Sequence, residues 1–167
     1  MTIILQRIRL FVRTADGRSS GTDSPVDLRF EASGSYPGDG WQSVSLDHPW
    51  NDRERSRTES YEVDFTIGDE TVDDAPRGLS YRDWSEARNA QFKLEIRGSD
   101  WWNVDFVFLL GDYISREPVP NSIDAFENTA LGWLLMARLD RNLSLSKDPS
   151  EGTAVHTIQL DGPLPTS

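Results

Sequence analysis

Polar and apolar residues alternate one for one in five separate stretches of this 167-residue chain. The stretches are 7–13, 26–31, 61–67, 92–96 and 104–110. Successive side chains of a β-strand point to opposite faces of its sheet, so this period of two predicts strands with one buried and one wet face. In the last stretch the alternation predicts that Val104, Phe106, Phe108 and Leu110 share the buried face, with Trp102 continuing it.

Turn-forming residues separate these stretches, as in segments 15–17, 33–40, 47–52 and 98–100. Many short strands with such punctuation are typical of an antiparallel β-sandwich. We expect strands near 5–13, 25–32, 41–46, 60–67, 91–97, 102–110, 133–140 and 154–160. The predicted fold class is therefore all-β, an eight-stranded antiparallel sandwich with one or two short helices.

Two segments depart from the alternation. The first, 79–90, begins with Ser80 followed three residues later by Asp83, a capping-box-like pair that predicts a short helix. The second, 114–132, holds two prolines, which disfavour a central strand. We expect it to cross from one sheet to the other over an end of the sandwich, held down by Ile123 and Phe126.

Length and composition indicate one folded domain, expected over 1–161 with a flexible tail at 162–167. The net charge of −11 argues against nucleic acid as a partner, because phosphate binding needs a basic surface. There is no cysteine, which excludes disulfides and thiolate metal sites. No signal peptide or transmembrane segment is recognised, so the expected location is cytoplasmic or leaderless.

The stretch 14–30 resembles the start of a PLAT domain, the module shared by polycystin, lipoxygenase and the clostridial alpha-toxin. Gly21, Thr22 and Asp23 stand where that family has its GTD motif. The block 45–65, SLDHPWNDRERSRTESYEVDF, is similar to the next family motif, and segments 92–109 and 141–160 are similar to its later strand, acidic loop and closing hairpin. The resemblance implies a two-sheet, eight-stranded sandwich.

The resemblance also implies calcium as a weakly bound cofactor, held by oxygen atoms from three loops. The candidate ligands are Gly21, Asp23, Asp47, Asn51, Asp52 and Asp100. Ser19 and His48 stand where the family offers an aspartate and an asparagine, so each replacement removes an oxygen or a charge and should lower the affinity for calcium. Aspartate and asparagine in loops also cap turns by hydrogen bonds to their own backbone, and this second explanation of the loops stays open.

Four tryptophans divide into two groups. Trp50 and Trp101 lie in or beside the same loops, and an indole suits an interface because it combines an apolar body with one N–H donor. These two are the expected contacts with a membrane or a partner. Trp41 and Trp84 are expected to lie in the core or to cover it.

No nucleophile elbow, phosphate loop or dinucleotide fingerprint is present in the sequence, and no catalytic residue is assigned. The expected function is a non-catalytic binding module that docks to membrane lipid or to a protein, with or without calcium. The alternatives are an interaction subunit of a separate enzyme and a small enzyme with a carboxylate or His48 in a cleft. Exposed aromatic side chains in the loops would favour membrane docking. A large apolar face would favour protein docking, and a deep pocket would favour an enzyme.

Overall fold

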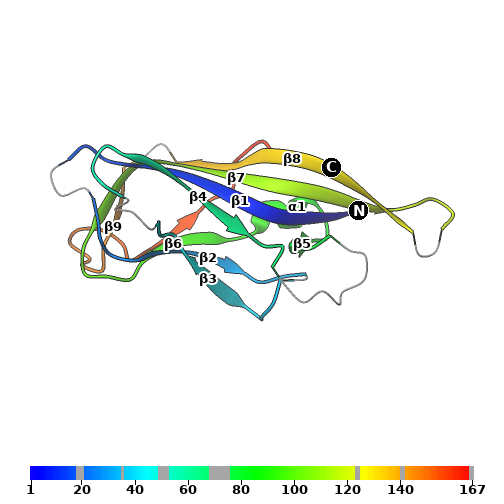
Figure 1. The fold of residues 1–167 in the computed structure, drawn as a ribbon, viewed down its shortest axis with the longest axis horizontal. Coiled ribbons are helices and arrows are strands. Elements are labelled where there is room, and N and C mark those ends of the chain that lie inside the picture. The colour runs from blue at the N-terminus through cyan, green and yellow to red at the C-terminus, as the bar shows by residue number, and fades with distance from the viewer. Residues whose placement is uncertain are drawn as a thin grey trace.

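The computed structural model describes residues 1–17, 21–34, 36–48, 53–67, 76–122, 125–139 and 142–165. Its elements are β1 (Thr2–Thr14), β2 (Val26–Glu31), β3 (Trp41–Ser45), β4 (Thr58–Asp64), β5 (Leu79–Tyr81), α1 (Trp84–Asn89), β6 (Phe92–Ile96), β7 (Trp102–Pro118), β8 (Phe126–Leu139), β9 (Leu143–Leu145) and β10 (Val155–Ile158). The strands form two antiparallel sheets, one above the other (Figure 1). The predicted β-sandwich is therefore confirmed.

Sheet A has the strand order β4-β1-β7-β8, with β5 also paired to β1 and β9 to β7. Sheet B has the order β10-β6-β2-β3. The predicted number of strands, eight, is too low. The strands that the alternation missed include β5 and β9, each only three residues long, which is too short to show a period.

The core lies between the two sheets. Ile8, Leu10 and Val12 of β1 are buried, as their alternation predicts. Trp102 is also buried, and its indole Nε1 donates a hydrogen bond of 3.0 Å to the Thr14 hydroxyl. This bond satisfies the one polar atom that the indole brings into the core.

A β-bulge in β7 overturns the predicted orientation of its later residues. Arg13 of β1 pairs with Phe106, but the next residue, Thr14, pairs with Val104, so Asp105 is an extra residue in β7. One extra residue exchanges the two faces for everything that follows. Val107 and Leu109 are consequently buried, whereas Phe106, Phe108 and Leu110 lie on the outer face of sheet A.

The predicted helix over 79–90 is shorter than expected. Residues 79–81 form β5, and α1 covers only Trp84–Asn89. The helix is capped by Asp83, whose carboxylate accepts a 2.9 Å hydrogen bond from the Glu86 amide. Trp84 is buried on this helix, as predicted, but Trp41 on edge strand β3 is exposed, so the prediction that it is core or cover is wrong.

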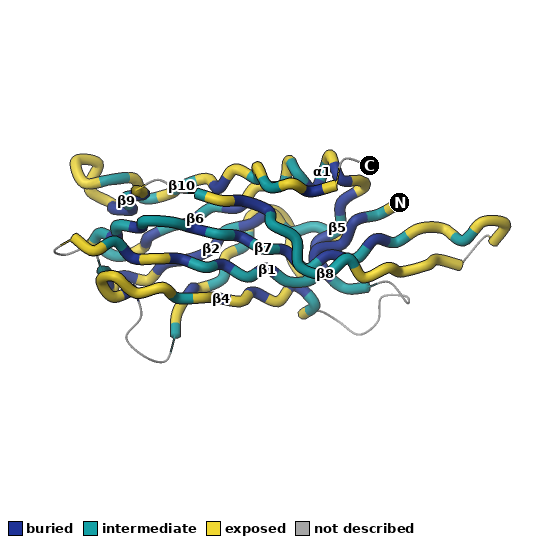
Figure 2. Tube along the Cα trace, turned by 90° about the horizontal axis from the view of Figure 1, so that it is seen from above, coloured by how far each residue is buried: buried dark blue, intermediate teal, exposed yellow. Residues whose placement is uncertain are grey.

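The predicted crossover at 114–132 is wrong. β7 continues to Pro118 and pairs with β8 in one long hairpin, and the end of this hairpin projects beyond the rest of the sandwich (Figure 1). Figure 2 shows that this projecting end is exposed. Phe126 does not hold the segment down: it is exposed, and the Arg116 guanidinium carbon lies 4.2 Å from its ring centroid. Ile123 lies outside the described residues.

Residues near the C-terminus run along the edge of β8. The Gly162 amide donates to the Met136 carbonyl at 2.8 Å, and Leu164, in the stretch expected to be a tail, is buried. Arg88 of α1 donates a 2.6 Å hydrogen bond to the Leu164 carbonyl. In the described part of the chain, no helix has the length and hydrophobicity needed to cross a membrane.

Candidate functional site

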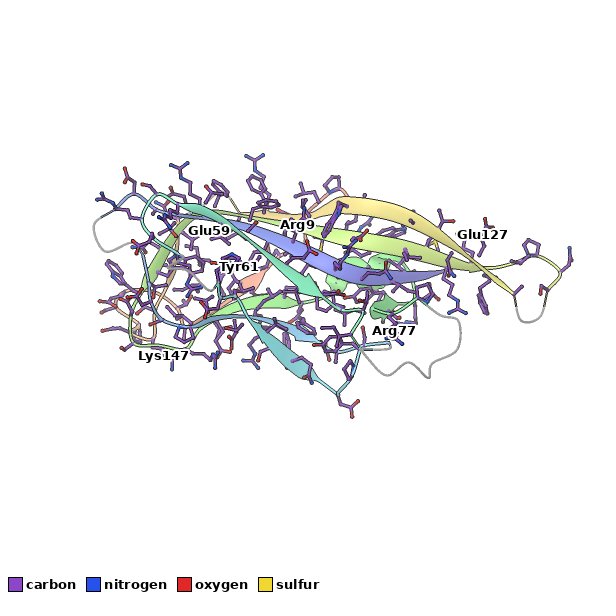
Figure 3. The ribbon with its side chains drawn as sticks, viewed as in Figure 1. Arg9, Glu59, Tyr61, Arg77, Glu127 and Lys147 are labelled. Atoms are coloured by element: carbon purple, nitrogen blue, oxygen red, sulfur yellow. The ribbon has the colours of Figure 1, made fainter. Side chains whose placement is uncertain are left out.

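The three loops that carry the predicted metal ligands meet at one end of the sandwich. A Cβ added at Gly21 would lie 2.8 Å from the Arg53 carbonyl oxygen, so these two loops are in contact. The Asp23 amide donates to the Asp100 carboxylate at 3.4 Å, which joins the first loop to the third. We call these residues, 21–24, 46–48, 53–56 and 98–101, the loop end. Lys147 lies at this end of the molecule, and Glu127 on the β7–β8 hairpin lies at the other (Figure 3).

The Asp100 carboxylate accepts hydrogen bonds from nearby backbone amides. One carboxylate oxygen accepts from the Asp23 amide, and the other accepts from the Trp101 amide at 2.9 Å. The Asp100 amide in turn donates to the Ser24 hydroxyl at 3.1 Å. The GTD turn is closed in the same way, since the Thr22 hydroxyl accepts from the Ser24 amide at 3.0 Å. Both are the turn chemistry that polar loop residues commonly supply.

Asp47 faces a positive charge. Arg53 is buried, and its Nη1 donates to the Leu46 carbonyl at 2.5 Å. Its Nη2 lies 3.6 Å from an Asp47 carboxylate oxygen. A cation bound to Asp47 would therefore have a guanidinium as a close neighbour, which lowers the affinity of this carboxylate for calcium.

Among the described residues, no three histidine, cysteine, aspartate or glutamate side chains come together to hold a metal ion. Ser19, Trp50, Asn51 and Asp52 lie outside those residues. The structure thus brings Gly21, Asp23 and Asp100 together and places Asp47 beside Arg53. A calcium site stays a prediction.

Trp101 and His48 complete the predicted residues at this end. Trp101 is half-buried, so part of its surface is accessible. The His48 ring stacks on Tyr61 with centroids 4.6 Å apart, and its Nε2 lies 3.0 Å from the Ser60 carbonyl oxygen. These contacts explain His48 as a packing residue between its loop and β4.

A second candidate site, which the sequence analysis did not find, covers the outer side of sheet A. Cross-strand pairs place Phe11 beside Phe108, Leu110 beside Leu135, and Asp112 beside Trp133. All of these apolar side chains are half-buried. We call the set the aromatic–arginine face; its residues are Arg7, Arg9, Phe11 and Arg13 of β1, Phe106, Phe108, Leu110 and Asp112 of β7, and Trp133, Leu135 and Arg138 of β8.

The arginines of this face lie close to its aromatic rings. The guanidinium carbons of Arg9 and Arg7 lie 4.7 Å and 5.5 Å from the Trp133 ring centroid, and that of Arg138 lies 5.4 Å from Phe108. Distances below about 6 Å allow cation–π attraction. The face therefore combines apolar rings with cationic side chains that can lie flat on them.

Acidic side chains balance these cations. The Arg7 Nη2 is 2.5 Å from Asp112, and the Arg9 Nη2 is 2.5 Å from Glu62. The hydrogen bond to Asp112 raises the pKa of the Arg7 guanidinium. Arg13 adds a longer pair of 3.6 Å with Asp105. Because the pairs cancel, this face carries little of the net charge of −11.

Comparison with solved structures gives the fold. Alpha toxin from Clostridium absonum is 16% identical to this chain, with a TM-score of 0.55, over 93% of this chain and 31% of the toxin. The chain has a PLAT-like β-sandwich fold. A coral 8R-lipoxygenase, described as activated by calcium via a C2-like domain, is also 16% identical, with a TM-score of 0.43, over 92% of this chain and 16% of the enzyme.

This PLAT-like sandwich spans less than a third of the toxin and less than a fifth of the lipoxygenase. No protein-family model matches the chain. No curated protein matches it either. At these identities the likeness establishes the fold alone.

Proposed function

We propose that this chain is a non-catalytic docking module that binds lipid membranes through the aromatic–arginine face of sheet A. The observation that carries the proposal is the row of half-exposed Phe, Leu and Trp side chains bordered by arginines. Aromatic rings suit the boundary between headgroups and acyl chains, and arginine stems lie along apolar surface while the guanidinium stays at the headgroups.

Charge distinguishes this face from the loop end. Asp23, Asp47 and Asp100 are all exposed at the loop end, which repels an anionic membrane unless a cation intervenes. The aromatic–arginine face carries little net charge, because three of its four arginines, Arg7, Arg9 and Arg13, are paired with acids. We therefore expect docking to zwitterionic vesicles and only a weak dependence on salt.

The test is co-sedimentation with phosphatidylcholine vesicles, with and without phosphatidylserine. Trp133→Ser removes the ring that the Arg7 and Arg9 guanidiniums approach, and we expect about a tenfold loss of binding from the lost apolar contact. Trp41→Ser is the matched control, because Trp41 is an exposed tryptophan that belongs to edge strand β3 of sheet B. Equal losses in both variants, or no sedimentation of the wild type with any vesicle, would reject the proposal.

Calcium enters as a separate arm of the same experiment. Calcium-assisted docking predicts that millimolar calcium increases sedimentation with the phosphatidylserine vesicles and leaves phosphatidylcholine vesicles unaffected. Such a result would assign a contribution to the loop end, with Asp47, Asp52 and Asp100 as ligands. An identical result in calcium and in EGTA would remove calcium from the function.

Protein docking is the second candidate. The observation that favours it is the composition of the same face, since tryptophan and arginine are enriched among residues that dominate protein interfaces. The near neutrality of the face also suits a protein surface. If no vesicle binds while Trp133→Ser leaves the fold intact, this second function becomes the better explanation of the face.

A further inference from the structure

One long seam of the sandwich is open. A groove of about 660 Å³ lies where the edge strands β8 and β9 of sheet A approach β10 of sheet B. Its walls include Ala137, Leu139, Leu143, His156 and Ile158. A volume in this range is typical of small-molecule sites.

Strand register shows which side chains face inward along this seam. Directly paired residues of an antiparallel sheet share a face. Ala137, Leu139 and Leu143 pair with the buried Leu109, Val107 and Val104, and Ile158 pairs with the buried Phe92. These four apolar side chains therefore point between the sheets, and the small Ala137 leaves space that a larger residue would fill.

His156 is the polar exception among them. It pairs with the buried Leu94, so its imidazole occupies a core-facing position at the edge of the sheet. Burial lowers the pKa of His156, which favours the neutral ring. No hydrogen bond joins this ring to another residue in the described part of the chain. A neutral imidazole offers one donor and one acceptor.

The surroundings of the groove argue against an anionic occupant. Asp161 stands on the rim, where one carboxylate oxygen accepts from the Arg138 amide at 3.3 Å. The Arg138 guanidinium lies by Phe108 on the outer face. The C-terminal residues 162–164 lie along β8 beyond the rim, which limits how far a bound chain can extend between the sheets.

We propose that this groove binds one neutral, chain-like molecule, with its apolar body between the sheets and a hydroxyl or ester carbonyl at His156. Fatty alcohols and acylglycerols have this chemistry. The groove shares only Arg138 with the aromatic–arginine face, and single-molecule binding here does not require docking to a membrane.

The test is a titration of the full chain with octanol, followed through the backbone amide resonances in two-dimensional NMR. We expect saturable shifts centred on Ala137, Leu139, Leu143 and Ile158. Octanoate at pH 8 is the matched probe of equal chain length. Burying its charge beside a neutral imidazole should weaken its binding about tenfold relative to octanol.

Two variants and a control locate the site. Ala137→Leu fills the groove and should abolish saturable binding. His156→Leu keeps the volume but removes the hydrogen bond, so octanol should bind about fivefold more weakly. Val155→Ala is the control, because Val155 is exposed on the neighbouring position of the same strand and faces away from the groove.

Each remaining outcome decides against the groove. Shifts that stay linear up to the solubility limit, shifts centred on Phe108 and Trp133, or octanoate binding as tightly as octanol would overturn the proposal. If Ala137→Leu does not fold, the proposal is tested by comparing the octanol affinities of His156→Leu and Val155→Ala. Equal affinities in those two variants would overturn the proposal.

Discussion

The loop end and the aromatic–arginine face use their charged groups in opposite ways. At the loop end the charges hold the chain together: Asp100 accepts two backbone amides, and the buried Arg53 ties Asp47 to the Leu46 carbonyl. On the face, Arg7 and Arg9 pair with acids on neighbouring strands and remain about two-fifths exposed. The difference shows that residues that match a binding motif can serve to stabilise the fold. The accessible binding surface can instead consist of residues that belong to no motif.

The largest effect should separate the two kinds of arginine. Arg53→Met removes a buried guanidinium and leaves the Leu46 carbonyl without that donor, so we expect a loss of about 3 kcal/mol in the free energy of unfolding. Arg9→Met removes a partly exposed ion pair and should cost less than about 1 kcal/mol. Urea denaturation of both variants measures the difference. Similar losses would mean that the two regions do not differ in this way.

Two glycines, Gly21 at the loop end and Gly132 next to Trp133 of the face, should give a smaller difference. Gly21→Ala places a Cβ 2.8 Å from the Arg53 carbonyl oxygen, so the loops must separate, at an expected cost of about 2 kcal/mol. Gly132, on β8, has a φ of +71° with nothing within 4 Å of an added Cβ, so Gly132→Ala should cost only its backbone strain, about 1 kcal/mol. Thermal unfolding should show the larger drop in Tm for Gly21→Ala. The reverse order would show that the loops at Gly21 separate easily.

Calcium should produce the smallest effect. If the loop end binds it with a Kd near the millimolar range, calcium at twice the Kd would stabilise the chain by about 0.6 kcal/mol, a rise in Tm of roughly 1–3 °C. The measurement is the Tm in calcium and in EGTA, repeated with Asp52→Ala and Asp100→Ala. Arg9→Met serves as the control that should retain the rise. An unchanged wild-type Tm would mean that the loop end does not bind calcium and that its aspartates only cap turns.

Much of the fold could be predicted because its signal is local. The apolar positions of β1 are buried as their alternation predicts, since each strand side chain chooses its face from the residues beside it. The hairpin over 114–132 was missed because its prolines argued against a strand. Pro118 ends β7, and Pro120 lies in the turn beyond it, so neither interrupts the paired ladder.

The candidate face could not be predicted because it depends on one irregularity of pairing. Without the extra residue at Asp105, Phe106, Phe108 and Leu110 would point into the core, as the sequence pattern indicates. The bulge is visible only in the register between β1 and β7, residues far apart in the chain. The role of Trp133 could not be predicted from the sequence either. It depends on Arg7 and Arg9 of β1, whose guanidiniums reach the Trp133 ring across β7.

The pairing of β1 with β7 also has a consequence for how the chain is made. Thr2 pairs with Arg116, so β1, the first strand of this sandwich to be synthesised, cannot complete its ladder until nearly the whole of β7 has followed. At ordinary rates of translation this delay is on the order of ten seconds. Before β7 is synthesised, β1 can pair with β4 on one side, but its partner on the other side, β7, is absent. We expect refolding to be slow for a chain of this size, because its central contacts join distant residues.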